Sequence, residues 1–296
     1  MCIRDSDTSF ALGKDLANDV ANGPTGTTVH IKTTTHTENL KTSNVVAETP
    51  GGDKKNVVMA GAHLDSVNDG PGINDNGTGS ATLLELARQI SKLGVEPENK
   101  IRFGWWGAEE EGLIGSTEYV AGLKKKAIAK IALYLNFDMI GSPNFARLIY
   151  DGDGSAFDTP GPKGSDKIEK TFAKHFKRAD LATEETQFDG RSDYLAFTDA
   201  GIPAGGLFTG AEEVKTEEQK ALFGGKAGVA FDACYHQACD DIDNVSRKGL
   251  KQMAPAVADA VARFSVSTDS LGGGKGSGKD RALSSQVEYL GSHLAR

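Results

Sequence analysis

The sequence predicts an α/β fold, a three-layer sandwich in which helices flank a mixed, mostly parallel central sheet. Apolar strand-like runs alternate with helical patterns through the middle of the chain, which is typical of such folds. Three of the runs each stop at a histidine or an acidic side chain, namely His63, Glu109 and Asp138. Because ligands collect at the carboxyl ends of strands in these folds, the two observations agree.

Residue patterning predicts the individual elements. A helix at 77–94 places Leu83, Leu84 and Ile90 along one face before Gly94 ends it. The last long helical pattern contains Pro255, a residue that can kink a helix. Strands are expected at 27–35, 43–48, 56–63, 100–109, 130–140 and 202–210, and further helices at 116–126, 167–177, 194–200 and 245–265.

Composition limits the class of function. The chain has 296 residues, of which 38% are hydrophobic and 25% charged, so a sizeable core can form. The formal net charge of -8 leaves no basic face for binding a phosphate backbone, and nucleic acid is not expected as a partner. The sequence has no run of about 18 apolar residues, so no membrane span is expected.

The segment GAHLDSV places His63 and Asp65 at the end of a strand. A carboxylate two residues after a histidine can orient the imidazole of a metal ligand. In isolation, however, the pattern is more often an ordinary histidine beside an aspartate. Asp75 follows in a glycine-rich turn, where an Asx turn or a helix N-cap is the alternative interpretation.

Further carboxylates follow two apolar strands. Glu109 and Glu110 belong to three adjacent acidic residues, which are costly after a buried strand without a cation, although a solvated helix start is the alternative. Asp138 ends another apolar strand and needs a partner there. A mixed N/O ligand set of two imidazoles and three carboxylates suits zinc, and one shared carboxylate could bridge two ions. The five candidate ligands are His63, Asp75, Glu110, Asp138 and His236.

These motifs, in this order, resemble peptidase family M28, and most closely its secreted aminopeptidases of the Streptomyces type. The likeness covers about residues 43 to 265 and is carried by GAHLDSV, GINDNGTGS, RFGWWGAEEEGLIGS, YLNFDMIGSPN, GRSD, GGLFTG and AFDACYHQACD. A set of ordered motifs at strand ends is far more specific than any single motif. The resemblance implies the fold of the zinc-dependent exopeptidases and hydrolysis of N-terminal residues from peptides.

Carried over position by position, the resemblance implies two zinc ions. Asp75 is the implied bridging carboxylate. His63 and Asp138 complete one site, and Glu110 and His236 complete the other. In this family the peptide bond after the bridging aspartate is usually cis, so a cis bond is expected between Asp75 and Asn76.

The implied general base is Glu109, next to a ligand but not itself one. It takes a proton from a water or hydroxide held between the zinc ions and delivers it to the leaving amine. Asp65 is the implied partner of the His63 ring. Tyr235 is placed to stabilise the oxyanion, with an ordinary packed tyrosine as the alternative.

The resemblance also implies how a substrate is bound. Glu109, Asp138 and Arg191 shape the end that receives the free α-amino group, although Arg191 could instead form a structural salt bridge. Phe208 corresponds to a side chain lining the pocket for the first substrate residue, which suggests a preference for Leu, Phe or Met. A core phenylalanine is the alternative interpretation of Phe208.

Cys234 and Cys239 flank His236, and the resemblance implies that they form a disulfide bracing this loop. A disulfide suggests an oxidising, extracellular setting. The segment 151–155, DGDGS, is similar to the start of a calcium loop but lacks the downstream acidic position, so a turn is favoured and calcium is not expected.

The resemblance also divides the chain. Residues 1–42 look like the end of a truncated protease-associated domain, with 1–6 a possible artefact, while 43–268 form the catalytic domain and 269–296 a flexible tail. We therefore expect a fragment of a secreted protein, with the signal peptide lost together with the upstream segment. The active form is expected to be a monomer.

Two alternatives remain at this point. An M20-type carboxypeptidase or deacylase uses similar ligands but carries a lid domain between its late acidic ligand and its last histidine. In this chain, helix and strand patterns of the main fold already fill the interval between Asp138 and His236. A catalytically inactive binding domain of the same fold is the alternative from a different class. Such domains lose metal ligands or the general base, whereas this chain keeps the five ligands and Glu109.

Overall fold

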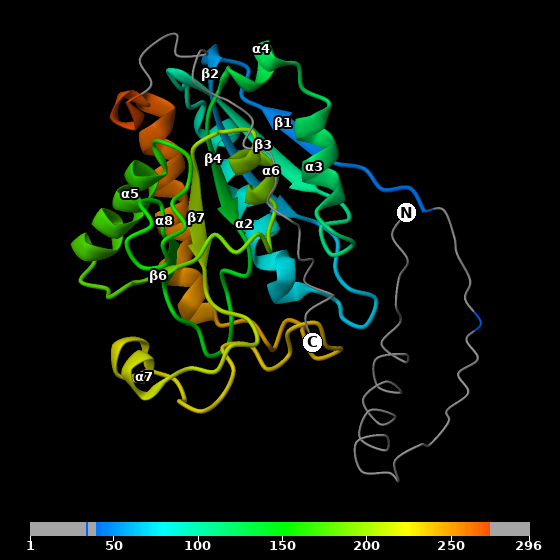
Figure 1. Cartoon of the computed structure of the whole chain (residues 1–296), viewed down its shortest axis with the longest axis vertical. Helices are drawn as coiled ribbons and strands as arrows, with labels where there is room; N and C mark the ends of the chain where they lie inside the picture. Colours follow the sequence, from blue (N-terminus) through cyan, green and yellow to red (C-terminus); the bar gives the residue numbers. More distant parts are fainter. Residues whose placement is uncertain (1–33, 35–39, 273–296) are drawn as a thin grey trace, which may run out of the picture. The chain divides into compact units, whose positions relative to one another are not determined.

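A seven-stranded mixed sheet forms the centre of the fold (Figure 1). In spatial order its strands are β1 (Val45–Glu48), β3 (Asn99–Trp106), β2 (Asp53–His63), β4 (Ile131–Phe137), β7 (Ala204–Phe208), β5 (Leu148–Tyr150) and β6 (Glu184–Thr186). Four of the six neighbouring pairs are parallel, and the antiparallel pairs are β1 with β3 and β5 with β7. The predicted mixed, mostly parallel sheet is confirmed.

The computed structural model describes residue 34 and residues 40–272, and every described element lies in the unit that begins at Thr42. Most of the strand expected at 27–35, most of the remnant at 1–42 and the tail beyond residue 272 lie outside the described residues. Within the described part of the chain, no helix is both long enough and apolar enough to cross a membrane.

Two layers of helices cover the sheet (Figure 1). The first layer contains α2 (Gly79–Leu93), α5 (Ser165–Arg178) and α8 (Arg247–Val266). The second layer contains α3 (Ile114–Ala121) and α6 (Tyr194–Asp199). Phe172 and Val257 join the core cluster under the first layer, and Trp106 and Phe197 join the cluster under the second. Burial of these apolar faces is what holds the layers to the sheet.

The register of β2 explains why polar strand ends meet. Gly61 in β2 pairs with Asn136 in β4, so His63 and Asp138, each two residues further along these parallel strands, reach the same level. On the other side of β2, His63 pairs with Trp106, the last residue of β3. The turn that follows β3 therefore starts beside His63.

Several short elements differ from the sequence prediction. The helix expected at 116–126 forms two pieces, α3 and the single turn α4 (Lys125–Ile128). Strands β5 and β6 and helix α7 (Glu217–Phe223) were not predicted. The helix expected at 245–265 forms as α8 and includes Pro255. Two further turns are η1 (Ile73–Thr78) and η2 (Asp269–Leu271). The end of α2 follows expectation, because Gly94 caps it with a φ of 61°.

Candidate metal centre

Five segments of the chain converge at the carboxyl ends of the central strands. His63 is the last residue of β2, and Asp138 directly follows β4. The other acidic and imidazole groups come from turns and loops: Asp75, Glu109, Glu110 and His236. The structure brings all of these candidate residues together, as the following distances show.

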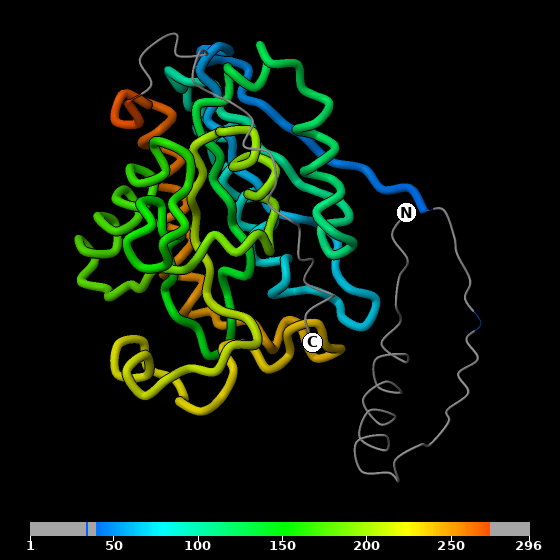
Figure 2. Tube along the Cα trace, in the orientation of Figure 1, coloured from blue at the N-terminus to red at the C-terminus, as the bar shows by residue number. Residues whose placement is uncertain are grey.

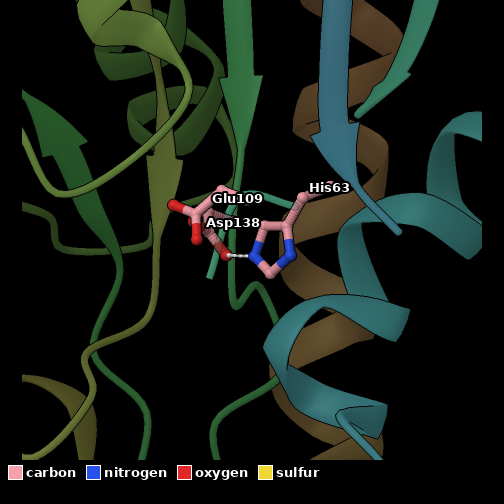
Figure 3. A group of neighbouring side chains, drawn as sticks. All are labelled: His63, Glu109 and Asp138. Atoms are coloured by element: carbon pink, nitrogen blue, oxygen red, sulfur yellow. Dashed lines mark hydrogen bonds and ion pairs between the residues drawn. The ribbon is translucent and has the colours of Figure 1, made fainter. Parts of the chain in front are cut away.

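His63 faces two carboxylates through one ring nitrogen. Its Nε2 lies 3.1 Å from Oδ1 of Asp75 and 3.2 Å from Oδ1 of Asp138. Figure 3 shows this ring with Asp138 and with Glu109, which lies on the same side of it. The other ring nitrogen, Nδ1, lies 3.0 Å from the carbonyl oxygen of Asp65. A carbonyl can only accept, so Nδ1 carries a hydrogen and Nε2 is the nitrogen available to a metal.

His236 repeats this arrangement on the other side of Asp75. Its Nε2 lies 3.2 Å from Oδ2 of Asp75 and 3.0 Å from Oε2 of Glu110. The two oxygens of Asp75 therefore face two different histidines. Each histidine forms a group of one nitrogen and two carboxylate oxygens, and Asp75 is the member that both groups share.

The spacing of these atoms fits zinc. Tetrahedral zinc binds nitrogen and oxygen at about 2.0–2.1 Å, which places neighbouring ligand atoms about 3.3 Å apart. Nitrogen-to-oxygen separations in the two groups run from 3.0 to 3.2 Å. A mixed set of imidazole and carboxylate ligands is also one that zinc accepts.

Electrostatics favours a cation at the same place. The four carboxylates of the centre are buried, none of them more than 8% exposed: Asp75, Glu109, Glu110 and Asp138. Burial raises the pKa of Glu110 to about 7 and that of Glu109 well above its ordinary value. Burial alone would lower the pKa of His236, but Asp75 and Glu110 raise it to about 10. A metal ion that took the imidazole nitrogens would displace such protons and neutralise the carboxylates.

Unusual backbone conformations surround the centre. The peptide bond between Asp75 and Asn76 is cis, as expected from the resemblance. Three residues other than glycine that flank or belong to the centre have positive φ: Ala108 at 58°, Met139 at 46° and His236 at 57°. Such conformations are uncommon for residues with a side chain and often occur at functional sites.

The loop that carries His236 is braced in two ways. Cys234 and Cys239 form a disulfide, the pair that the resemblance implied. The ring of Tyr235 stacks on the imidazole of His236 with ring centres 3.8 Å apart. Nη2 of Arg191 lies 3.3 Å from the hydroxyl of Tyr235, and its Nη1 lies 3.0 Å from Oε1 of Glu212.

A pocket opens beside the centre. Its lining includes carboxylates of the centre together with apolar and aromatic side chains, among them Met139, Tyr150 and Phe208. Phe208 is part of β7 and only half-buried, so its ring is accessible from the pocket. Arg191 and Tyr235 line the same pocket.

Asp65 lies close to the centre and contacts both the His63 ring and the turn after β3. Its carboxylate is 3.8 Å from Nδ1 of His63, so the closer contact to that ring comes from its carbonyl oxygen. The carboxylate instead accepts hydrogen bonds from the backbone N–H groups of Glu109, at 2.9 Å, and Glu110, at 3.2 Å. Asp65 therefore holds the backbone of the turn that presents both glutamates.

Sequence reasoning did not identify Ser192 and Asn136. The hydroxyl of Ser192 donates to Oδ2 of Asp138 at 2.6 Å, and Nδ2 of Asn136 donates to Ser192 at 2.8 Å. Ser192 belongs to the GRSD segment, which was one carrier of the resemblance but gave no role for the serine. Asn136 lies inside an apolar strand, and that placement was the available signal.

A second acidic group lies away from the centre. Asp151, Asp153 and Glu169 approach one another within the described residues. The carboxylate of Asp151 accepts the backbone N–H groups of Ser155, Ala156 and Phe157, and that of Glu169 accepts those of Gly152 and Asp153. These bonds are those of a tight turn, the interpretation that the sequence favoured.

The sandwich fold and the paired histidine and carboxylate groups define a metal-binding α/β protein. The sequence model of Peptidase family M28 matches residues 44–261. The chain belongs to this peptidase family.

Named relatives agree with the family. Over 259 residues the chain is 51% identical to leucine aminopeptidase 2 of Arthroderma otae, covering 88% of this chain and 52% of the relative. It is 55% identical over 228 residues to an aminopeptidase of Pseudomonas aeruginosa, covering 77% of this chain and 42% of the relative. The structure of a zinc aminopeptidase from Bacillus subtilis matches with a TM-score of 0.61 at 26% identity, covering 80% of this chain and 52% of that one. The chain thus spans about half the length of these relatives.

Proposed function

We propose that this chain carries the catalytic domain of a zinc aminopeptidase, in residues 43–268. The observation that supports it most is the sharing of Asp75, whose two oxygens lie 3.1 and 3.2 Å from the Nε2 atoms of His63 and His236. A bridging carboxylate between two nitrogen and oxygen groups suits a pair of metal ions. The zinc aminopeptidase of Bacillus subtilis with the same fold supports zinc as the metal.

The proposal divides the ligands between two zinc ions. One site consists of His63 and Asp138, the other of Glu110 and His236, and Asp75 belongs to both. When bound, the ions supply Lewis acidity that lowers the pKa of a water molecule and polarises the scissile carbonyl. Protein side chains carry out the proton transfer and stabilise the oxyanion.

Glu109 is the proposed general base. Its carboxylate is buried, lines the pocket and lies on the same side of His63 as Asp138 (Figure 3). From there it takes a proton from the attacking water and passes it to the nitrogen of the leaving amine. The carboxylate of Asp65 accepts a hydrogen bond of 2.9 Å from the backbone N–H of Glu109, which supports the turn that presents the base.

Tyr235 is the proposed donor to the developing oxyanion. Nη2 of Arg191 lies 3.3 Å from the Tyr235 hydroxyl oxygen and donates to it, which leaves the hydroxyl hydrogen free to point into the pocket. A donor aimed at the position where negative charge develops stabilises the transition state more than the substrate.

The proposed substrates are peptides with a free N-terminus and a large hydrophobic first residue. The carboxylates of Glu109 and Asp138 would meet the α-ammonium group, while Phe208 offers apolar surface in the same pocket. The name of the Arthroderma otae relative, a leucine aminopeptidase, supports this preference. A disulfide between Cys234 and Cys239 supports secretion as the setting.

Hydrolysis of leucine p-nitroanilide tests the proposal. Activity should require zinc, disappear with a chelator and return when zinc is added back. Glu109→Ala should lower kcat by about 100- to 10,000-fold while zinc binding is retained. The matched control is Glu118→Ala, which removes an exposed glutamate of α3 and should leave kcat unchanged. Folded wild-type protein that binds zinc without any turnover would instead identify an inactive binding domain.

A further inference from the structure

Hydrogen bonds at both ends of the loop that carries His236 hold it to the loop that carries Asp75. Figure 2 shows the two segments, around residues 66–76 and 232–244, lying beside each other although they are far apart in the chain. A buried aspartate at each end of the disulfide-bonded segment accepts these hydrogen bonds. These are Asp232, two residues before Cys234, and Asp240, directly after Cys239.

Asp240 holds the backbone of the loop that presents the shared ligand. Its Oδ1 accepts the N–H of Asn74 at 2.9 Å, and its Oδ2 accepts the N–H of Asp75 at 3.0 Å. Its carbonyl oxygen accepts the N–H of Ile73 at 2.9 Å. Three successive amide groups therefore point at one residue, and the position of the Asp75 backbone is fixed relative to Asp240.

Asp232 holds the same loop through a side chain. Its Oδ2 accepts a hydrogen bond of 2.6 Å from Nδ2 of Asn74, and its Oδ1 accepts the N–H of Cys234 at 2.8 Å. Nδ2 of Asn244 lies 3.0 Å from Oδ1 of Asp240 and 3.0 Å from both oxygens of Asp232, so it joins the two aspartates.

Burial gives these bonds their value. Asp232 and Asp240 are each 1% exposed, and Asn74 is fully buried. A buried carboxylate is costly unless several donors satisfy it, and bonds to a charged acceptor are stronger than neutral ones. The carboxylates therefore strongly favour the one arrangement in which all of these N–H groups reach them.

We propose that Asp232 and Asp240 are positioning residues that keep His236 and Asp75 at metal-binding distance. His236 lies between them on a segment closed by the Cys234–Cys239 disulfide, and its Nε2 lies 3.2 Å from Asp75. This inference rests on the proposed zinc function, since it concerns how two of the proposed ligands are placed. The zinc site of Glu110 and His236 depends most on the pair, because both His236 and the shared Asp75 are held by it.

Asp65 supports the inference by the same geometry elsewhere in the centre. It too accepts two successive backbone N–H groups, those of Glu109 and Glu110, in the turn that carries a ligand. Carboxylates that orient metal ligands without touching the metal typically change metal affinity by about 10- to 100-fold when replaced.

The test is a zinc titration of folded protein against a fluorescent chelator, with Asp240→Asn as the main variant. An asparagine keeps one accepting oxygen and loses the other. We expect the affinity of the zinc site of Glu110 and His236 to fall by about 10- to 100-fold. Asp243→Asn is the matched control, since it makes the same change on an exposed residue nearby and should leave both affinities unchanged. If Asp240→Asn does not fold, Asn244→Ala takes its place. It removes the amide joining the two aspartates and should lower the same zinc affinity.

The outcomes separate the two proposals. A purely structural role for Asp240 would lower the stability of the zinc-free protein and leave both zinc affinities within about twofold of wild type, since affinity in folded protein reports only ligand placement. That result would overturn the inference alone. Wild-type protein that takes up no zinc would overturn the proposed function itself.

Discussion

Ser192 donates a hydrogen bond of 2.6 Å to Oδ2 of Asp138. The other oxygen of Asp138 lies 3.2 Å from Nε2 of His63. One oxygen of this carboxylate therefore accepts a hydrogen bond from Ser192, and the other faces His63 in the candidate metal centre. Nδ2 of Asn136 donates to Ser192, so the single hydrogen of the hydroxyl is directed to Asp138.

The direction of these bonds is set deeper in the core. Nε1 of Trp106 can only donate, and it donates to the hydroxyl of Tyr134 at 2.9 Å. Tyr134 in turn donates to Oδ1 of Asn136 at 3.1 Å, which turns the amide nitrogen of Asn136 toward Ser192. A donor-only group at one end and a carboxylate at the other therefore fix every hydrogen in this chain of bonds.

Ser192→Ala should weaken zinc binding at the site of His63 and Asp138 by about 10- to 100-fold, because Asp138 loses the bond that orients it. A chelator competition titration measures this affinity. Ser91→Ala, on the exposed surface of α2, is the control for loss of a serine hydroxyl. Equal zinc affinities in Ser192→Ala and wild type would contradict the predicted role.

Phe208→Ala should reduce the preference for large first residues. Loss of the ring is expected to lower kcat/KM for leucine p-nitroanilide by about 10- to 100-fold, and to change kcat/KM for alanine p-nitroanilide much less, because the smaller substrate has less apolar surface to bury. Phe157→Ala, at a ring that is 41% exposed and not among the residues lining this pocket, should change neither value. A parallel loss for both substrates would show that Phe208 does not select the first residue.

Removing the disulfide should destabilise the fold. Closing the short loop between Cys234 and Cys239 is worth about 2 kcal/mol in the chain-entropy description. The variant Cys234→Ala/Cys239→Ala should lose about this much free energy of unfolding, measured with urea. In native wild-type protein a thiol label detected by mass spectrometry should spare Cys234 and Cys239, and labelling of both would rule the bridge out.

Lys215 predicts a pH dependence of stability. Burial lowers its pKa from the ordinary 10.5 to about 8, and its Nζ donates to the carbonyl oxygens of Phe145 and Gly224. Between these two pH values the unfolded chain binds the proton that the folded protein has released, so the contribution of Lys215 to stability rises with pH. Wild type should therefore gain stability relative to Lys215→Met between pH 7 and pH 9.5, as measured by urea unfolding.

The control for this prediction is Lys248→Met, at an exposed position of α8. Its stability relative to wild type should stay constant over the same pH range, since this side chain is surrounded by solvent rather than buried. A Lys215→Met curve parallel to wild type would contradict the prediction.

The sequence predicted the long elements because their patterns extend over many residues. The apolar run ending at His63 and the amphipathic helix before Gly94 both have enough length to show a period. Strands β5 and β6 have three residues each, too few for alternation, and their pairing depends on partners distant in sequence. The helix expected at 245–265 also forms, as α8, because the packing of its apolar face on the sheet outweighs the N–H group missing at Pro255.

The candidate centre was predictable where residue type alone indicates chemistry. His63, Asp75 and His236 each allow an ordinary explanation alone, and it was the order of their motifs along the chain that indicated one site. Contacts that depend on backbone groups were not predictable, and Asp65 illustrates this: its carboxylate binds two N–H groups whose direction exists only after the turn has folded. Ser192 was missed because a serine has many ordinary uses and its partner lies on another element.

The distribution of the five proposed ligands along the chain has a thermodynamic consequence. A zinc ion bound by Asp75, Glu110 and His236 would cross-link three segments that meet only in the folded protein, and the unfolded chain offers no comparable site. Binding confined to the native state stabilises it by RT ln(1 + [L]/Kd), or about 2.7 kcal/mol at a free zinc concentration 100 times Kd. The metal would therefore act as a reversible cross-link, and the resistance of this domain to unfolding would depend on how much zinc surrounds it.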